Sequence, residues 1–144
     1  IRKHRLWEVF LVDKLRFSWD EVHEVAEQLE HIKSKKLTRE LDAFLEFPKE
    51  DPHGDPIPDA NGNMPSSQKL LLAKVKQLQR CICVGVKDST PKFLQYLDKH
   101  KIALGTEITV LSRESYDESM AVKINNIQRS ISKEVAHNLF VKIS

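Results

Sequence analysis

Apolar residues recur every three or four positions through the first part of the chain, a spacing typical of amphipathic helices. The pattern predicts one helix near the start and a second that follows Ser18 and Glu21, which have the spacing of a capping box. A third fits residues 35–46 and ends before Pro48. The predicted apolar faces are Leu6, Trp7, Phe10, Leu11 and Leu15; Val22, Val25, Ala26, Leu29 and Ile32; and Leu37, Leu41, Phe44 and Leu45.

A different pattern begins after a stretch rich in proline and glycine. Residues 48–67 contain five of the six prolines and two of the four glycines, which predicts an irregular linker. Beyond it, apolar residues alternate with polar ones or form short runs, as in β-strands. Strands are expected within 70–86, near 107–113 and over 120–128, with short helices at Pro91 and Ser132. This half therefore predicts a small barrel-like β module.

The two patterns together predict an α+β protein. We expect a helical domain over residues 1–47, a linker over 48–69 and a β domain over 70–144. Charge separates the halves, because residues 1–62 hold 10 Lys/Arg against 14 Asp/Glu and residues 63–144 hold 13 against 7. The lysines of the basic half are scattered, without an arginine cluster or an aromatic platform, so a solvated surface is favoured over a nucleic-acid surface.

Histidines and carboxylates gather on one side of the second predicted helix. At about 100° per residue, one arc collects His23, Glu27, Glu30 and His31. Neighbouring carboxylates repel each other on a bare helix, so a divalent cation among them is an economical explanation. For this face alone a solvated charged surface is the commoner case. His4 and Glu8, four residues apart on the first helix, favour a metal because two helices then bring at least five donors together.

Other chemistry is not indicated by the sequence. A His-Glu-x-x-His motif, a Gly-rich phosphate loop and a Gly-x-Ser-x-Gly elbow are all missing, so we do not expect an enzyme. Cys81 and Cys83, two apart in an apolar run, cannot bridge each other and are expected in a β core, which suits a reducing cytosol. His53, His100 and His137 are expected at turn or surface positions. No apolar run approaches the ~20 residues of a membrane-spanning helix.

Bulky apolar side chains exceed what three short helices can readily bury. They are Trp7, Phe10, Phe17 and Trp19. Such a surplus predicts association with a second copy of the chain. We expect a twofold dimer through residues 1–46, with Trp7, Phe10 and Trp19 at or near its interface.

Three runs resemble, in order and spacing, the dimerisation domain of the diphtheria toxin repressor family of metal-dependent transcriptional repressors. They are RKHRLWEVFLVDKL, HEVAEQLEH and DPHGDPIP. The part that ends SISKEVAHNLFVKI is similar to the SH3-like, FeoA-type domain that these repressors often carry at the C-terminus. Family members begin with a winged helix-turn-helix that reads operator DNA, and nothing in this chain corresponds to it. The chain also opens on Ile1 and not on Met. We therefore expect it to be the sensor and dimerisation region of a longer repressor. The expected location of that repressor is the cytoplasm.

The resemblance implies two metal sites. The family's regulatory site, completed by donors from the N-terminal domain, corresponds to Glu27, Glu30 and His31, and its ancillary site to His4, Glu8 and His23. Glu27 stands where iron-responsive members have a cysteine, as in manganese-responsive members, and a hard carboxylate favours Mn(II). Fe(II) is the second choice, and Zn(II) is possible in the isolated protein. Ser89 and Lys92 stand where iron-type members lend a Glu and a Gln to the ancillary site.

Two other function classes stay open beside the metal sensor. One is an SH3-like protein-interaction module without metal sensing, and the other is a metallohydrolase. Titration with manganese, followed by a search for hydrolysis, separates them. An interaction module ignores the metal, a sensor binds it without turnover, and an enzyme turns a substrate over.

Overall fold

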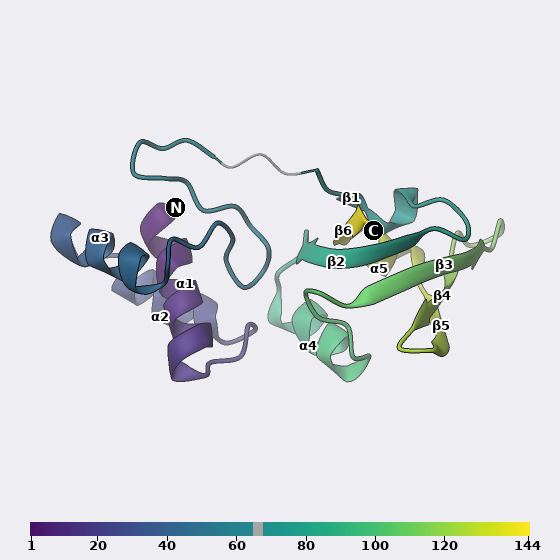
Figure 1. Cartoon of the computed structure of the whole chain (residues 1–144). Coiled ribbons are helices and arrows are strands. Elements are labelled where there is room, and N and C mark those ends of the chain that lie inside the picture. Colours follow the sequence, from purple (N-terminus) through teal and green to yellow (C-terminus); the bar gives the residue numbers. More distant parts are fainter. Residues whose placement is uncertain (65–67) are drawn as a thin grey trace. The chain divides into compact units, whose positions relative to one another are not determined.

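The computed structural model describes residues 1–64 and 68–144, and the chain divides into two compact units (Figure 1). The first unit contains the helices α1 (Arg2–Leu15), α2 (Val22–Leu29) and α3 (Lys35–Phe44). The second is built on an antiparallel sheet. The predicted α+β class is therefore confirmed.

Local signals in the sequence explain where the helices begin and end. α1 ends because Arg16 adopts a left-handed conformation with φ 62° and its N–H donates to the Leu11 carbonyl. α3 begins after Ser34, whose hydroxyl accepts a hydrogen bond of 3.1 Å from the N–H of Leu37.

The capping-box pair before α2 makes a turn of its own. Ser18 donates to the Glu21 carboxylate through its backbone N–H at 2.9 Å and its hydroxyl at 2.6 Å. In a complete capping box the Ser18 hydroxyl would also accept a hydrogen bond from the Glu21 N–H. Here the hydroxyl donates to the Glu21 carboxylate instead, and regular helix begins only at Val22. α2 therefore begins late, and it ends at Leu29, before the last residues of the predicted metal-binding arc.

α1 is the central helix of the first unit because it contributes to both of its apolar clusters. One cluster consists of Leu6, Val9, Leu41 and Ile57, and the other of Leu11, Val22 and Ala26. Trp7 packs against both. Burial of each large aliphatic side chain contributes about 1.5–3 kcal/mol, so these two clusters hold the helices together.

The first part of the predicted linker folds against the helices. Asp51, His53 and Ile57 are all at most 6% exposed. The turn that carries them is closed by a hydrogen bond of 2.9 Å from the Asp51 N–H to the Asp55 carbonyl. Prolines fix the turn and Ile57 gives it an apolar anchor, so this segment behaves as part of the helical unit and not as a spacer.

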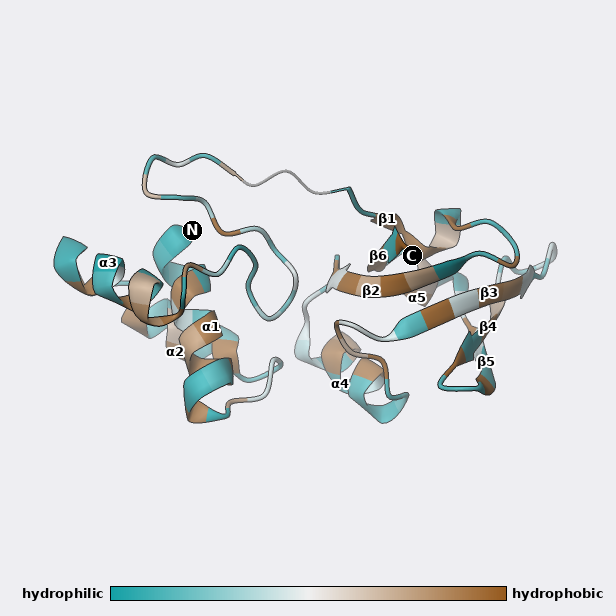
Figure 2. Ribbon diagram, in the orientation of Figure 1, coloured by the Kyte–Doolittle hydropathy of each residue, from teal (hydrophilic) through white to brown (hydrophobic). Residues whose placement is uncertain are grey.

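The second unit is a six-stranded sheet with the strand order β1-β6-β2-β3-β4-β5, and all its neighbouring strands are antiparallel. The strands are β1 (Leu70–Leu71), β2 (Arg80–Val86), β3 (Glu107–Arg113), β4 (Met120–Ile124), β5 (Ile127–Ile131) and β6 (Leu139–Ile143). The short helices in this part of the sequence are η1 (Leu72–Lys74), α4 (Pro91–Lys99) and α5 (Lys133–Ala136), and the first residues of α4, up to Leu94, belong to the other unit. Figure 2 shows β2 coloured as apolar over most of its length, whereas apolar and polar residues follow one another along β3; both patterns were used to predict strands.

The predicted single strand over residues 120–128 is wrong. β4 and β5 form a hairpin that turns at Asn125 and Asn126, whose φ angles are 52° and 64°. Positive φ at both central residues is typical of the tight turns that suit the twist of a hairpin. Asn-Asn is a weaker turn signal than Asn-Gly, and the apolar alternation continues across it.

Both cysteines lie in the interior of the second unit, as predicted. Cys81 is 0% and Cys83 is 1% exposed. Burial raises the pKa of each thiol to about 11, so neither is a ready nucleophile or metal ligand at neutral pH. In the described parts of the chain, every helix is too short or too polar to cross a membrane.

Candidate metal centre

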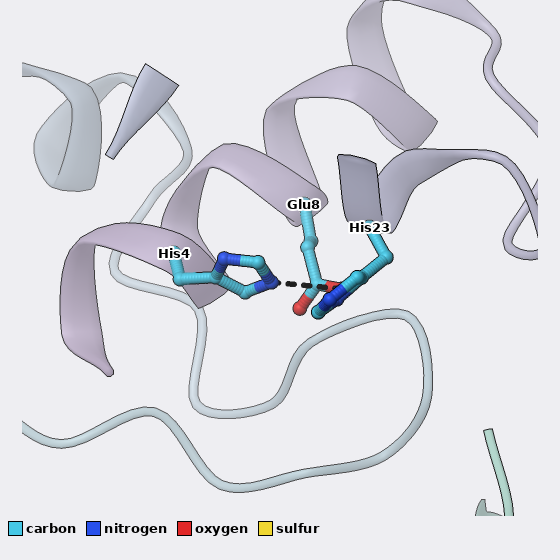
Figure 3. Close-up of side chains that lie close together, drawn as sticks. All are labelled: His4, Glu8 and His23. Atoms are coloured by element: carbon cyan, nitrogen blue, oxygen red, sulfur yellow. Dashed lines mark ion pairs between the residues drawn. The ribbon is translucent and has the colours of Figure 1, made fainter. Parts of the chain in front are cut away.

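Glu8 of α1 is the centre of a group of polar side chains in the helical unit. Its side chain is 4% exposed, and its Oε2 lies 3.6 Å from Nε2 of His4, one helical turn earlier. His23 of α2 completes the group, with its ring centroid 4.9 Å from that of His4. Figure 3 shows the three side chains pointing toward one another from the two helices. One donor atom from each lies within 4.8 Å of the others.

The sequence builds this group by two steps. The spacing of four residues puts His4 and Glu8 on one face of α1. His23 follows Val22, which is buried against Leu11 in the apolar cluster between α1 and α2. Helix packing therefore brings the second imidazole to the first.

The chemistry of the group suits a divalent transition metal. Two imidazole nitrogens and one carboxylate oxygen match manganese, iron or zinc better than calcium or magnesium, which prefer oxygen donors alone. Burial lowers the pKa of His4, and His23 acts in the same direction, although the carboxylate of Glu30 opposes them. A lowered pKa keeps the imidazole neutral, as a metal ligand must be.

Glu27 and Glu30 border the same group. Oε1 of Glu30 lies 3.6 Å from Nδ1 of His4, and Oε2 of Glu27 lies 3.8 Å from Nε2 of His23. A shallow pocket of about 320 Å³ is lined by Ile1, His4, Arg5, His23, Glu27 and Glu30. Four of the six predicted ligands thus line one pocket, and Glu8 lies buried beside His4.

His31 is the exception among the predicted ligands. α2 ends at Leu29, and His31 lies exposed in the turn that follows. The prediction that it shares one helical arc with His23 and Glu27 is therefore wrong, because the helix does not reach it. Its role as a metal ligand stays a prediction.

A second group, which the sequence did not reveal, shares Glu8 with the first. It consists of Glu8, Asp51 and His53, which are 3%, 4% and 4% exposed. Nδ1 of His53 lies 3.4 Å from Oε2 of Glu8 and 3.9 Å from Oδ2 of Asp51. His53 is a turn residue, as predicted, but its side chain points into the interior. No local signal in DPHGDPIP indicates that partner on α1.

The His53 ring is contacted by both the carbonyl group and the indole ring of Trp19. Its Nε2 lies 2.6 Å from the carbonyl oxygen of Trp19, so this nitrogen carries the proton and donates. The Trp19 ring stacks on the imidazole with an interplanar angle of 15°.

The second group has shifted proton affinities. Burial raises the pKa of Glu8 to about 8, and Asp51 adds to the shift. Burial works in the opposite direction on His53, but Asp51, the Trp19 carbonyl and Glu8 together raise its pKa to about 9. Asp51 is itself buried, yet its hydrogen bonds with His53 and Glu8 hold its pKa below the usual range. An imidazolium, one carboxylate and one carboxylic acid leave the group nearly neutral at pH 7.

Known families match both parts of the chain. A model described as "Iron dependent repressor, metal binding and dimerisation domain" matches residues 1–59. A model of the FeoA domain matches residues 70–143. The first match contains both polar groups around Glu8, and the second contains the six-stranded sheet.

Individual proteins are similar to the chain over different lengths. The iron-dependent repressor IdeR of Mycobacterium tuberculosis is 45% identical over 58 residues, which are 40% of this chain and 25% of that protein. A probable metal transport system membrane protein of Chlamydia trachomatis is also 45% identical over 58 residues, 40% of this chain and 13% of that one. A solved structure described as a manganese-dependent transcriptional repressor complex with manganese is 35% identical, with a TM-score of 0.91, and the match covers 100% of this chain and 69% of that chain. The chain thus spans a quarter or less of these two curated relatives.

Proposed function

The chain belongs to the diphtheria toxin repressor family of metal-dependent regulators, which are not enzymes, and on this premise we propose that it senses manganese for a transcriptional repressor. It carries the metal-binding and dimerisation domain and the FeoA domain of that family. The observation that carries the proposal is the convergence of His4, Glu8 and His23 from two helices. Neither imidazole is needed to pack the core, and together they offer a divalent ion two nitrogens and an oxygen.

Two metal sites divide the ligands between them. His4, Glu8 and His23 form the ancillary site, and Glu27, Glu30 and His31 contribute to the regulatory site. The second set supplies only part of the roughly six ligands that manganese prefers, so donors outside this chain or water complete it. The proximity of Glu30 to His4, 3.6 Å between donor atoms, supports two neighbouring sites.

Manganese is the proposed metal, and iron(II) is the second candidate. The carboxylate of Glu27 is a hard ligand, which favours manganese over thiophilic ions. The similar solved structure is described as a complex with manganese, whereas IdeR is named as iron-dependent. Zinc(II), a strong binder of imidazole, can occupy the ancillary site of the isolated protein.

The whole repressor binds operator DNA through a winged helix-turn-helix outside this chain, in the cytoplasm. The similar manganese-dependent repressor, of which the chain covers 69%, supports the first part of this proposal. The two free, buried cysteines are consistent with a cytoplasmic location.

Calorimetric titration with manganese tests the metal sites. Because its ligands all lie within this chain, the ancillary site should give the tighter binding event. We expect His23→Ala to remove that event and Glu30→Ala to leave it. The opposite ranking would assign the stronger site to Glu30, and a wild type that releases no heat would favour the interaction module without metal sensing.

A homodimer is proposed through exposed apolar side chains of the helical unit. Those at least 38% exposed include Leu15, Ile32, Leu37, Phe44 and Phe47. Trp7 and Phe10, predicted at the interface, already pack edge to face within one chain at 5.6 Å. Phe44, whose ring lies 6.3 Å from that of Phe10, extends this aromatic surface outward. We therefore place Phe44 in the interface.

Phe44→Glu should convert the dimer into a monomer. A buried interfacial aromatic typically contributes 2 kcal/mol or more, so the dissociation constant should rise by about 30-fold or more. Sedimentation equilibrium measures it. Tyr116→Glu, which changes an aromatic residue that is 94% exposed in the other unit, is the control and should leave the dimer intact. A wild type that sediments as a monomer at micromolar concentration would contradict the proposal.

A further inference from the structure

We propose that the free edge of strand β5 (Ile127–Ile131) binds an extended, acidic segment of a partner protein, which joins the sheet as an additional strand. β5 stands at one end of the strand order, and among the described residues it pairs with β4 alone. An unpaired sheet edge is a template on which another chain can form main-chain hydrogen bonds. This edge belongs to the FeoA unit, and its proposed role does not depend on the metal sites.

The register of the hairpin determines which backbone groups of β5 face outward. A two-residue turn joins β4 to β5, so the flanking residues Ile124 and Ile127 form a hydrogen-bonded pair, and such pairs alternate along the ladder. The odd-numbered residues of β5 therefore bond to β4. The N–H and C=O groups of Gln128 and Ser130 point away from β4, and both residues are exposed. An incoming strand can pair with these groups.

The two edges of the sheet differ in their protection. β1 is two residues long, and the chain continues from it directly into the helical turn η1. Such a short edge strand limits pairing with other chains. β5 is five residues long, contains no proline and carries one charge, on Arg129. It lacks most of the features that block an edge, so it is the edge that can accept a partner strand.

Side chains on the inner face of β5 indicate which residues the partner strand presents. Ile127 is 54% exposed, although Ile124, its neighbour on β4, is 1% exposed. An apolar side chain on the added strand would cover Ile127. Arg129 lies two residues further on the same face, half-buried, and it forms no ion pair with the described residues. A carboxylate opposite Arg129 would pair with its guanidinium.

Charge favours an acidic partner over a second copy of this chain. Residues 63–144 hold 13 Lys/Arg against 7 Asp/Glu, so two copies of this part repel each other. Antiparallel self-pairing that uses both Gln128 and Ser130 also sets Arg129 directly opposite its own copy, and like charges in that position are destabilising. Lys123, which lies opposite Gln128 on β4, adds a second cation near the edge.

The test is nuclear magnetic resonance of the whole chain with the end-capped peptide Thr-Val-Thr-Glu-Thr-Val-Thr. The peptide reads the same in both directions, and its alternation can place glutamate opposite Arg129 and valine opposite Ile127. We expect it to shift the amide signals of residues 127–131. It should also slow hydrogen exchange at Gln128 and Ser130, whose N–H groups exchange fast in the free chain. Signals of β5 that do not change would overturn the proposal.

Two altered peptides distinguish strand addition from unspecific adhesion. Methylation of the backbone nitrogens of the two threonines beside the glutamate removes their hydrogen bonds to β5 and should weaken binding about 5- to 150-fold. Replacement of the glutamate by lysine should weaken binding about 2- to 30-fold, because lysine is repelled by Arg129. Equal affinity of the methylated peptide would refute main-chain pairing, and equal affinity of the lysine peptide would refute an acidic partner.

Substitutions in β5 test whether the peptide binds at this edge. Arg129→Glu should reverse the preference, so that the lysine peptide binds more tightly than the glutamate peptide. Gln128→Pro removes one outward N–H and keeps the ladder to β4, so it should weaken binding. Gln128→Ala retains the N–H and is the matched control. If circular dichroism shows that Gln128→Pro does not fold, the methylated peptide tests the same hydrogen bonds on wild type. An unchanged preference in Arg129→Glu would contradict the proposal.

Self-association through β5 is the competing outcome of the experiment. Slower hydrogen exchange at Gln128 and Ser130 as the concentration of the chain alone rises would show that the edge pairs with a second copy. The proposed acidic partner would then be wrong. Exchange at these two residues that is independent of chain concentration, and slowed only by the glutamate peptide, would support it.

Discussion

Glu8→Gln should reduce manganese affinity at the ancillary site by on the order of 100-fold or more. The loss of a metal ligand should cost at least as much affinity as the loss of a residue that only supports a ligand. Glu8 is the one carboxylate in the group that it forms with His4 and His23. Glutamine keeps the shape of the side chain and cannot carry its negative charge. The ion then loses the one anionic ligand of this group.

The same substitution should leave the metal-free fold nearly unchanged at neutral pH. Burial and Asp51 raise the pKa of Glu8 to about 8, so the wild-type side chain is mostly protonated and resembles a neutral amide. Circular dichroism of the two proteins should agree, while calorimetry separates them.

Glu24→Gln is the matched control for this experiment. Glu24 lies exposed on α2, in the same unit, so its loss of charge should alter manganese affinity by less than about threefold in a salt-containing buffer. Wild-type affinity in Glu8→Gln would mean that Glu27 and Glu30 build the tighter site instead.

The metal-free helical unit should lose stability as the pH rises from about 6.5 to 9. Burial lowers the pKa of His53, but Asp51, Trp19 and Glu8 outweigh it and raise the value from 6.5 to about 9. A histidine with a higher pKa in the folded state stabilises that state fully when the pH is below the unfolded value of 6.5. This stabilisation is lost as the pH rises through the folded value of about 9.

The carboxyl groups that face His53 set the rest of the profile. The raised pKa of Glu8, about 8 instead of 4.5, acts in the same direction, because the folded state keeps a proton that the unfolded state has lost. The lowered pKa of Asp51 acts at acid pH, where stability falls as the pH drops below the unfolded value of 3.8. Asp55 adds a further negative charge near Glu8. Since these groups share protons, the free energy of unfolding of the helical unit should fall by roughly 1 to 3 kcal/mol between pH 6.5 and 9.

Urea unfolding followed by tryptophan fluorescence measures this loss. Both tryptophans, Trp7 and Trp19, lie in the helical unit, so the signal reports that unit alone. EDTA keeps metal out of the experiment. The profile of His53→Phe should be flatter over the same range, and a wild-type midpoint that stays constant or rises toward pH 9 would contradict the prediction.

Local periodicity made much of this protein predictable from its sequence. The amphipathic spacing of α1 and the alternation along β3 follow from side-chain geometry over a few residues. For the same reason the pair His4 and Glu8 was found from its spacing alone. The buried positions of Cys81 and Cys83 followed from the apolar run around them.

Tertiary structure decided what depends on residues far apart in the chain. The approach of His23 to His4 requires α1 and α2 to pack, and the burial of His53 requires a turn rich in proline to fold back onto α1. Neither contact leaves a periodic signal, because the partners belong to different elements. A histidine in a turn reads as a surface residue until the carboxylate that it faces is known. The sequence thus determined which donors α1 carries, and the packing of the turn decided how Glu8 is held among them.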